Sequence, residues 1–164
     1  MASNDSFLKL DGIPGESMDA KHKDEIQLVG WRWGASQTGK MHEGGGGGAG
    51  KVKVHDLVCE MHLSKASPKL IHLVCTGQHI KHAFLSTRKA GKDQQDYLRI
   101  ALFDVLVSRI EQGQGLHQEE NDLPVDSVSL HFAKYQIEYF PQKADGSLGA
   151  ATQVKYDLKA MSHA

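Results

Sequence analysis

Residues 34–41 are the segment of the sequence that comes closest to a known ligand-binding motif. They read Gly-Ala-Ser-Gln-Thr-Gly-Lys-Met and follow a predicted strand, as a phosphate-binding P-loop does. A P-loop also requires a Ser or Thr after the lysine to bind Mg²⁺, and a helix whose N-terminus faces the phosphates. Here Met41 follows Lys40, and a run of glycines begins at Gly44 where a helix would be needed. A nucleotide hydrolase that uses Lys40 is therefore only a distant alternative.

His79 and His82, next to Cys75, form the most metal-like group among the ten histidines. A zinc site usually needs a second close pair of ligands, such as Cys-x-x-Cys or His-Glu-x-x-His, and the sequence has neither. The two cysteines, Cys59 and Cys75, are too few for a disulfide framework and suit small buried hydrophobic positions. We expect no metal and no cofactor.

Asp104 is the one carboxylate that interrupts an apolar strand, between Phe103 and Val105. A salt bridge, either at a subunit interface or within the sheet, is the favoured interpretation. The sequence contains no Gly-x-Ser-x-Gly elbow, and no pair of carboxylates stands out as an acid/base couple. The sequence therefore predicts that the protein is not an enzyme, and Phe103 and Asp104 become candidate subunit contacts.

Trp31 and Trp33 lie two residues apart in a predicted strand over residues 26–33. Strand alternation places them with Val29 on one face and Ile26 and Leu28 on the other. Large aromatic residues are usually core or interface residues, and a stacking platform for sugars or bases is the more specific alternative. The two tryptophans are thus candidate subunit contacts, and a barrel that binds a small ligand or carbohydrate is the alternative function.

Length and charge limit the remaining classes of function. A chain of 164 residues suits one domain, and a net charge of −1 provides no field to hold nucleic acid or an anionic membrane. The N-terminus lacks the basic and apolar regions of a signal peptide, and no apolar run approaches membrane-spanning length. We expect a single domain over 1–164 that is made in the cytoplasm, does not insert into membranes and needs another route for any export.

Residues 67–77 are the only segment that predicts a helix. Ser67 suits the N-cap, Pro68 the first helical position and Gly77 the left-handed residue that ends a helix. Its largely apolar sequence, with Leu73 and Val74 buried, predicts a helix covered on most sides.

Nearly every other regular segment predicts a strand, so the expected fold is mainly β. Residues 97–110 are apolar on both faces and should be central, or covered by another subunit. In residues 127–140 the apolar parity changes after Phe132, which predicts a bulge or bend near Ala133. The predicted strands cover residues 7–11, 26–33, 51–63, 83–89, 97–110, 127–140 and 153–160.

Residues 34–50 are predicted to form a long, irregular, glycine-rich loop. Five consecutive glycines, from Gly44 to Gly48, make ordering the chain costly, so the loop should be mobile in an isolated subunit. Loops of this length are commonly functional, which makes Lys40, Gly44 and Gly48 candidate contacts. A second polar loop, residues 111–124, contains an acidic cluster of unassigned role.

The order of motifs along almost the whole chain carries a family resemblance. These motifs lie at residues 8–17 (LKLDGIPGES), 19–26 (DAKHKDEI), 31–34 (WRWG), 44–57, 65–70 (KASPKL), 75–81 (CTGQHIK), 88–91 (RKAG), 104–108 (DVLVS), 128–134 (VSLHFAK) and 139–147 (YFPQKADGS). In this order they resemble the Hcp proteins, the haemolysin-coregulated proteins of type VI secretion systems.

The resemblance implies a compact β-barrel of two sheets with one short helix. It also implies a homohexameric ring, and rings that stack into the inner tube of a contractile injection machine. The expected partners are further copies of the chain, the spike and sheath components, and secreted effectors held in the lumen. The family provides no catalytic residues to carry over. The resemblance further implies secretion by the type VI system and contact between the 34–50 loop and a neighbouring ring.

Overall fold

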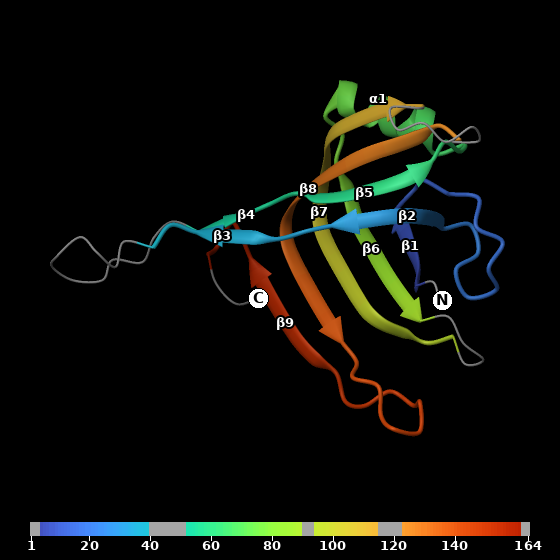
Figure 1. Cartoon of the computed structure of the whole chain (residues 1–164). Helices are drawn as coiled ribbons and strands as arrows, with labels where there is room; N and C mark the ends of the chain where they lie inside the picture. Colours follow the sequence, from blue (N-terminus) through green and yellow to red (C-terminus); the bar gives the residue numbers. More distant parts are fainter. Residues whose placement is uncertain (1–3, 40–51, 90–93, 115–122, 162–164) are drawn as a thin grey trace, which may run out of the picture.

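The computed structural model describes residues 4–39, 52–89, 94–114 and 123–161 as nine strands and a helix. Figure 1 shows the strands wrapped into a barrel, with the helix at one end. The elements in chain order are β1 (Asn4–Leu10), β2 (Ile26–Arg32), β3 (Ala35–Gln37), β4 (Val52–Val54), β5 (Leu57–His62), α1 (Ser67–Thr76), β6 (Ile80–Lys89), β7 (Asp96–Gly113), β8 (Val125–Tyr139) and β9 (Thr152–Asp157).

Seven strands form one antiparallel sheet in the order β5-β2-β1-β6-β7-β8-β9, and β5 also pairs with β8. That extra pairing closes the sheet into a barrel, whose interior is filled by aliphatic side chains from every wall. The second sheet is the small β3–β4 pair. The predicted mainly β barrel with a short helix is confirmed.

The structure differs from the prediction in the loop over residues 34–50 and in the strand over residues 51–63. Residues 35–37 form β3, which pairs with β4 in the register Ala35↔Val54. Residues 51–63 were expected to be one strand, but β4 pairs with β3 whereas β5 pairs with β2 and β8. The chain therefore changes sheets between β4 and β5. The polyglycine run lies outside the described residues.

The helix α1 begins one residue earlier than predicted, with Ala66 as its N-cap and Ser67 as a helical residue. The hydroxyl of Ser67 does not cap the helix because it donates to Asp126 and accepts from the Ser64 N–H. Gly77 ends the helix as predicted, with a φ of 67°.

The helix is buried along one face rather than on most sides. Leu70 and Leu73 are buried, Val74 is half-buried and Ile71 is exposed. The buried face packs against β7.

The bend predicted near Ala133 is present, and β7 bends with β8. The consecutive residues Phe132 and Ala133 are both buried, and opposite them Asp104 has a φ of 53°. The register between the two strands runs through this point without a shift, and their register shift lies between Val107 and Arg109. Beyond the bend β8 no longer pairs with β5 and takes β9 as its neighbour. The bend is thus the corner at which the barrel opens toward β9.

The predicted orientation of the two tryptophans is wrong. A register shift between Leu28 and Gly30 changes the alternation of β2. Trp31 then pairs with the buried Cys59, and both Trp31 and Trp33 pack against the core on the side of Leu28. One extra residue in a strand turns every later side chain to the opposite face.

Candidate assembly surfaces

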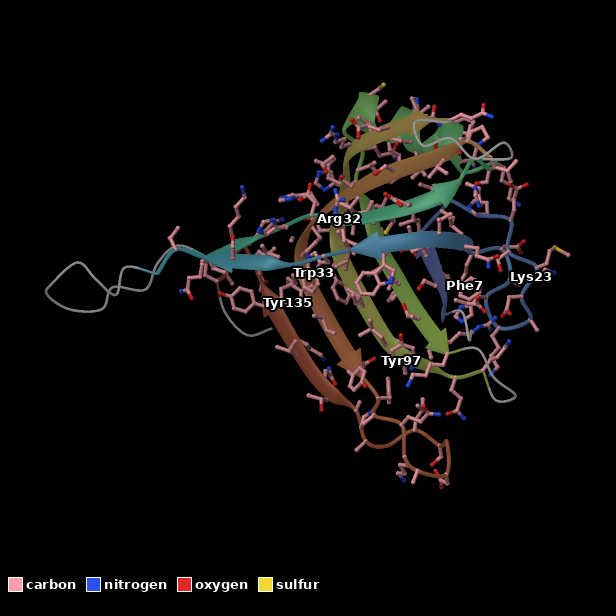
Figure 2. The ribbon with its side chains drawn as sticks, viewed as in Figure 1. Phe7, Lys23, Arg32, Trp33, Tyr97 and Tyr135 are labelled. Carbon is pink, nitrogen blue, oxygen red and sulfur yellow. The ribbon has the colours of Figure 1, made fainter. Side chains whose placement is uncertain are left out.

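The strands β3 and β4 form an arm that projects away from the barrel (Figure 1). All three residues of β3 are exposed. At the root of the arm, the Trp33 Nε1–H donates to the carbonyl oxygen of His55 (2.8 Å). The Trp33 ring makes edge contacts with Phe132 and Tyr135, at centroid distances of 5.9 and 5.0 Å. Figure 2 shows Trp33 next to Tyr135. Trp33 therefore fastens the arm to the barrel.

A broad groove of about 810 Å³ lies at the root of the arm, and it is the place to test the carbohydrate alternative. Trp33 lines this groove but Trp31 does not, so the two indoles do not form a continuous stacking platform. Asp56, another lining residue, accepts a hydrogen bond from Ser108 Oγ (2.6 Å) and binds His131 Nδ1 (2.8 Å), which also lines the groove. Asp56 and His131 are thus engaged with each other.

Asp104 forms a salt bridge within the subunit. Its carboxylate binds His79 Nδ1 (2.6 Å) and Lys159 Nζ (2.7 Å), which connects the bend in β7 to the segment after β9. The hydrogen bond from Lys159, followed by that from His79, holds the pKa of Asp104 at about 2. The same contact raises the pKa of Lys159. Asp104 therefore remains an anion that ties the corner of the barrel.

The other predicted residue of β7, Phe103, belongs to a small aromatic cluster. It is half-buried and meets the His82 ring edge-on at 5.5 Å, while His82 stacks on the exposed Phe84 at 5.9 Å. His82 also binds Asp11 through Nδ1 (2.7 Å). The cluster gives the outer face of β6 and β7 some apolar surface.

The metal-like histidines bind separate carboxylates instead of converging. His79 contacts Asp104, and His82 contacts Asp11. Among the residues that the structure describes, no group of three or more His, Cys, Asp or Glu side chains has the geometry to hold a metal ion. Cys59 is buried as predicted, which raises the pKa of its thiol to about 12. The predicted burial of Cys75 is wrong, because Cys75 lies on the exposed side of α1.

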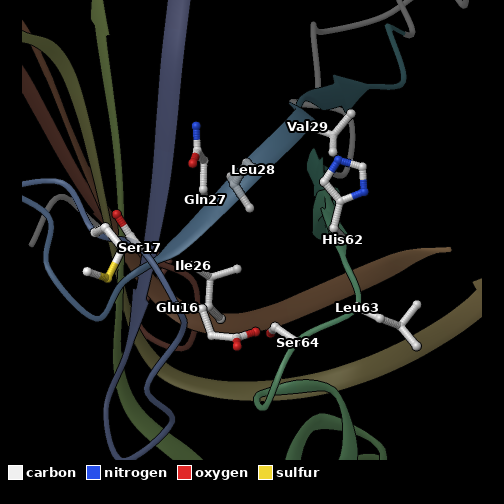
Figure 3. Close-up of a pocket in the computed structure, with 10 residues that line it drawn as sticks. Glu16, Ser17, Ile26, Gln27, Leu28, Val29, His62, Leu63 and Ser64 are labelled. Atoms are coloured by element: carbon white, nitrogen blue, oxygen red, sulfur yellow. The ribbon is translucent and has the colours of Figure 1, made fainter. Parts of the chain in front are cut away.

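A surface groove that the sequence did not indicate runs beside β2 and the end of β5 (Figure 3). It has a volume of about 560 Å³, and we call it the β2–β5 groove. Met18, Val29 and Leu63 in its lining are 91%, 55% and 45% exposed, so apolar surface is open to solvent here. The lining residues are Glu16, Ser17, Met18, Ile26, Gln27, Leu28, Val29, His62, Leu63 and Ser64.

The loop that supplies Met18 is fastened by a buried arginine. Arg88 Nη2 donates to Asp19 (2.5 Å) and Asp5 (3.3 Å), and its guanidinium lies over the Phe7 ring at 4.9 Å. The hydrogen bond from Arg88 is the main reason that the pKa of Asp19 falls to about 2.

His22, in the same loop, makes a second set of contacts. Its ring stacks on the Phe7 ring with the centroids 4.3 Å apart, and it binds Glu25 (2.8 Å) and Asp96 (3.1 Å). One wall of the groove is therefore held in place by several polar contacts.

Apolar surface is also open at the end of the sheet, where β9 has β8 as its neighbour and no further strand follows among the residues that the structure describes. Tyr139 and Val154 are 47% and 43% exposed. Their register partners are Thr152 and Ile137, which places all four side chains on one face of the β8–β9 pair. Ile137 packs against the core, and Tyr139 lines a small hollow with Tyr97, so this is the core-facing side of the strand pair, which we call the β8–β9 face.

Three predicted contact residues, Lys40, Gly44 and Gly48, lie outside the described residues, as does the acidic cluster of the second loop. Of the other predicted residues, Trp31 and Trp33 pack against the core, Phe103 lies in the aromatic cluster and Asp104 in the salt bridge. In the described part of the chain, no helix has the length and apolar character needed to cross a membrane.

Comparison with known proteins gives a consistent result. Residues 7–139 match the family model described as "Type VI secretion system effector, Hcp". The chain is 46% identical over 144 residues to Protein hcp1 of Pseudomonas aeruginosa, covering 87% of each chain. It is similar to the crystal structure of Hcp1 from Salmonella typhimurium, with 34% identity, a TM-score of 0.79 and full coverage of both chains. A structure described as that of a type six secretion system protein superimposes with a TM-score of 0.90 at 26% identity, covering 99% of this chain and 100% of the other.

Proposed function

The chain belongs to the Hcp family of type VI secretion system proteins, and we propose that it is the structural subunit of the secretion tube. In this proposal six copies form a closed ring, and rings stack into the tube that is exported. The observation that carries it is the likeness to Hcp1 of Salmonella typhimurium, which extends over both complete chains. The proposal therefore concerns the whole barrel and not a shared fragment.

The distribution of surfaces supports a ring that stacks. A head-to-tail ring needs two different contact surfaces on each subunit, and stacking needs further contacts above and below. The barrel offers an arm, the β2–β5 groove and the partly exposed β8–β9 face as separate features. A net charge of −1 also limits the repulsion between stacked subunits.

A structural role fits the polar residues better than catalysis does. Asp104, His79 and Lys159 join the corner of the barrel to the C-terminal segment, and Arg88 fastens the loop before β2. These groups are engaged in contacts that hold strands and loops together. The separate environments of Trp31 and Trp33 give no support to the carbohydrate alternative.

The proposed partners follow from family membership. They are further copies of this chain, the spike and sheath components, and effectors carried in the lumen. We propose that the protein neither binds nucleic acid nor inserts into a membrane. The protein would be made in the cytoplasm and would leave the cell through the type VI system.

The mass of the purified protein tests the ring. Native mass spectrometry at micromolar concentration should show a species six times the subunit mass, with no added cofactor. A monodisperse monomer would contradict the proposal.

Secretion provides a second test. The protein should be present in the medium of cells that carry the complete type VI system, and it should disappear from the medium when the sheath gene is deleted. Secretion without the sheath would argue for another export route.

A further inference from the structure

We propose that His22 is a pH-sensitive latch, which in its protonated form fastens the loop between β1 and β2 to β7 and in its neutral form releases that link. The part of the loop that it controls is the turn over residues 20–23. All the groups involved belong to one subunit, so the inference does not rest on the proposed ring.

The His22 ring has a carboxylate at each of its two nitrogen atoms. Nδ1 lies 2.8 Å from Glu25 Oε2 in the same loop, and Nε2 lies 3.1 Å from Asp96 Oδ1 at the start of β7. An ionised carboxylate only accepts hydrogen bonds, and a neutral imidazole carries a hydrogen on one nitrogen only. With both carboxylates ionised, both contacts are hydrogen bonds only when the ring is an imidazolium.

The burial of His22 makes the loss of either contact costly. The residue is 5% exposed, and its ring stacks on the Phe7 ring with an interplanar angle of 7°. Water has little access to replace a missing hydrogen, so a bare ring nitrogen would face a carboxylate directly. Loss of the proton therefore drives the ring and one carboxylate apart.

The charges around His22 also favour the protonated ring. Among the described residues, these charged groups are Asp19, Lys21 and Glu25 in the loop, Asp5 of β1, Arg88 of β6, and Asp96 and Arg99 of β7. They comprise four carboxylates and three cations. An imidazolium balances these charges, and loss of its proton leaves one negative charge in excess.

The contact with Asp96 should be the one that breaks. It is the longer of the two, and Glu25 is kept near His22 because its backbone N–H donates to the His22 carbonyl oxygen (3.2 Å). A neutral ring that keeps its hydrogen on Nδ1 still donates to Glu25 and turns a bare Nε2 toward Asp96. The link between the loop and β7 is thus the pH-dependent one.

The rest of the loop is fastened independently of His22. The Gly15 N–H donates to the Asp24 carbonyl oxygen (2.7 Å), and a Cβ on Gly15 would lie only 2.4 Å from the Glu25 carbonyl oxygen. Arg88 holds the Asp19 carboxylate, whose pKa of about 2 keeps it ionised at neutral pH. Release is therefore confined to the turn between Asp19 and the base of the loop.

Hydrogen exchange of the full chain, followed by mass spectrometry of its peptides, tests the latch. Exchange is measured at about pH 5.5 and about pH 8.5, which bracket the range in which histidine ordinarily changes charge, and is corrected for the intrinsic rate at each pH. Protection of residues 20–25 should fall about tenfold at the higher pH, the effect expected for the loss of one charge-assisted hydrogen bond. Equal protection at the two pH values would overturn the inference.

Three variants assign the effect to His22. His22→Gln removes the titrating ring and should abolish the tenfold fall. Asp96→Asn should abolish it too, because the introduced amide can donate to a bare Nε2 and keeps the contact at both pH values. The matched control is His131→Gln, which removes a histidine bound to a different carboxylate, Asp56, and should leave the fall unchanged.

The Asp96→Asn variant leaves the buried ring in place, so the test holds even if His22→Gln fails to fold. A fall in protection that persists in Asp96→Asn would overturn the inference, because the link to β7 would then not be its cause. A fall that disappears in His131→Gln would also overturn it, because the effect would then not be specific to His22.

Discussion

The hydroxyl of Ser67, the first residue of α1, donates a 2.5 Å hydrogen bond to the fully buried carboxylate of Asp126 at the start of β8. Gln112 of β7 donates to the other carboxylate oxygen (2.7 Å). One buried carboxylate therefore joins the helix to two strands. A buried charge without its donors is costly, so this junction makes a clear stability prediction.

Replacing Ser67 with alanine should lower the free energy of unfolding by about 1–3 kcal/mol, because Asp126 loses a donor and remains buried. Urea denaturation of the isolated protein measures the change. Ser36→Ala, on the exposed arm, is the matched control: it removes only an exposed hydrogen bond with His55 Nε2 (3.1 Å) and should alter stability by no more than about 0.5 kcal/mol. Equal effects of the two substitutions would mean that the Asp126 contact contributes nothing.

The helix should respond to charge according to the face that receives it. Leu73→Asp places a carboxylate in the core and should cost several kcal/mol, about 3 or more. The same change at Ile71, which is exposed, should be tolerated. Val74→Asp should lie between them, because Val74 is half-buried. Thermal melting ranks the three variants, and a fully stable Leu73→Asp protein would show that the helix is packed differently.

The contact between Asp19 and Arg88 should make part of the stability depend on pH. The folded-state pKa of Asp19 is about 2, below its ordinary value of 3.8. A depressed carboxyl pKa stabilises the folded protein above the ordinary value, and this contribution is lost as the pH falls from 3.8 toward 2. The stability difference between the unmodified protein and Asp19→Asn should therefore shrink as the pH is lowered through this window.

Urea unfolding at several pH values measures that difference. Asp24→Asn is the control, because Asp24 is an exposed carboxylate of the same loop. A gap between the unmodified protein and Asp19→Asn that stays constant down to about pH 2 would contradict the role given to Arg88.

Deleting residues 44–48 should affect stacking much more than folding. The deletion falls between β3 and β4, whose arm stands outside the barrel core. Halving the length of a flexible loop changes its closure free energy by only about 0.6 kcal/mol. The melting temperature and ring mass should stay nearly unchanged, while tube assembly and secretion fall. Normal secretion would make the segment dispensable, and loss of folding would mean that it packs within the subunit.

The sequence predicted features that depend on local patterns. Gly77 marked the end of the helix, the apolar run after Tyr97 marked the long strand β7, and the change in parity after Phe132 marked the bend. Each signal lies within a few residues of the structure that it specifies. The closed barrel was predicted from the family resemblance. That resemblance could specify the whole fold because its motifs span almost the whole chain.

Features that depend on distant residues were missed. Ser67 looked like an N-cap because its partner Asp126 lies far along the chain, and β3 forms only because β4 pairs with it. The bulge after Leu28 reversed the predicted face of Trp31. The β2–β5 groove was missed because its apolar lining comes from three segments that meet only in the folded chain.

The position of β9 at the end of the sheet has a mechanical consequence. Every other strand of the seven-stranded sheet has hydrogen-bonded neighbours on both sides, because β5 pairs with β8 as well as with β2. Force applied to the barrel is therefore distributed over backbone hydrogen bonds on both sides of each of these strands. The strand β9 is the exception, because it can separate from the barrel by losing its hydrogen bonds to β8 only. Among the strands of this sheet, its amides should exchange hydrogen with solvent first in a free subunit, because strands with fewer buried bonds open at lower cost. A neighbour that clamps this strand would turn the weakest part of the barrel into a joint that resists tension.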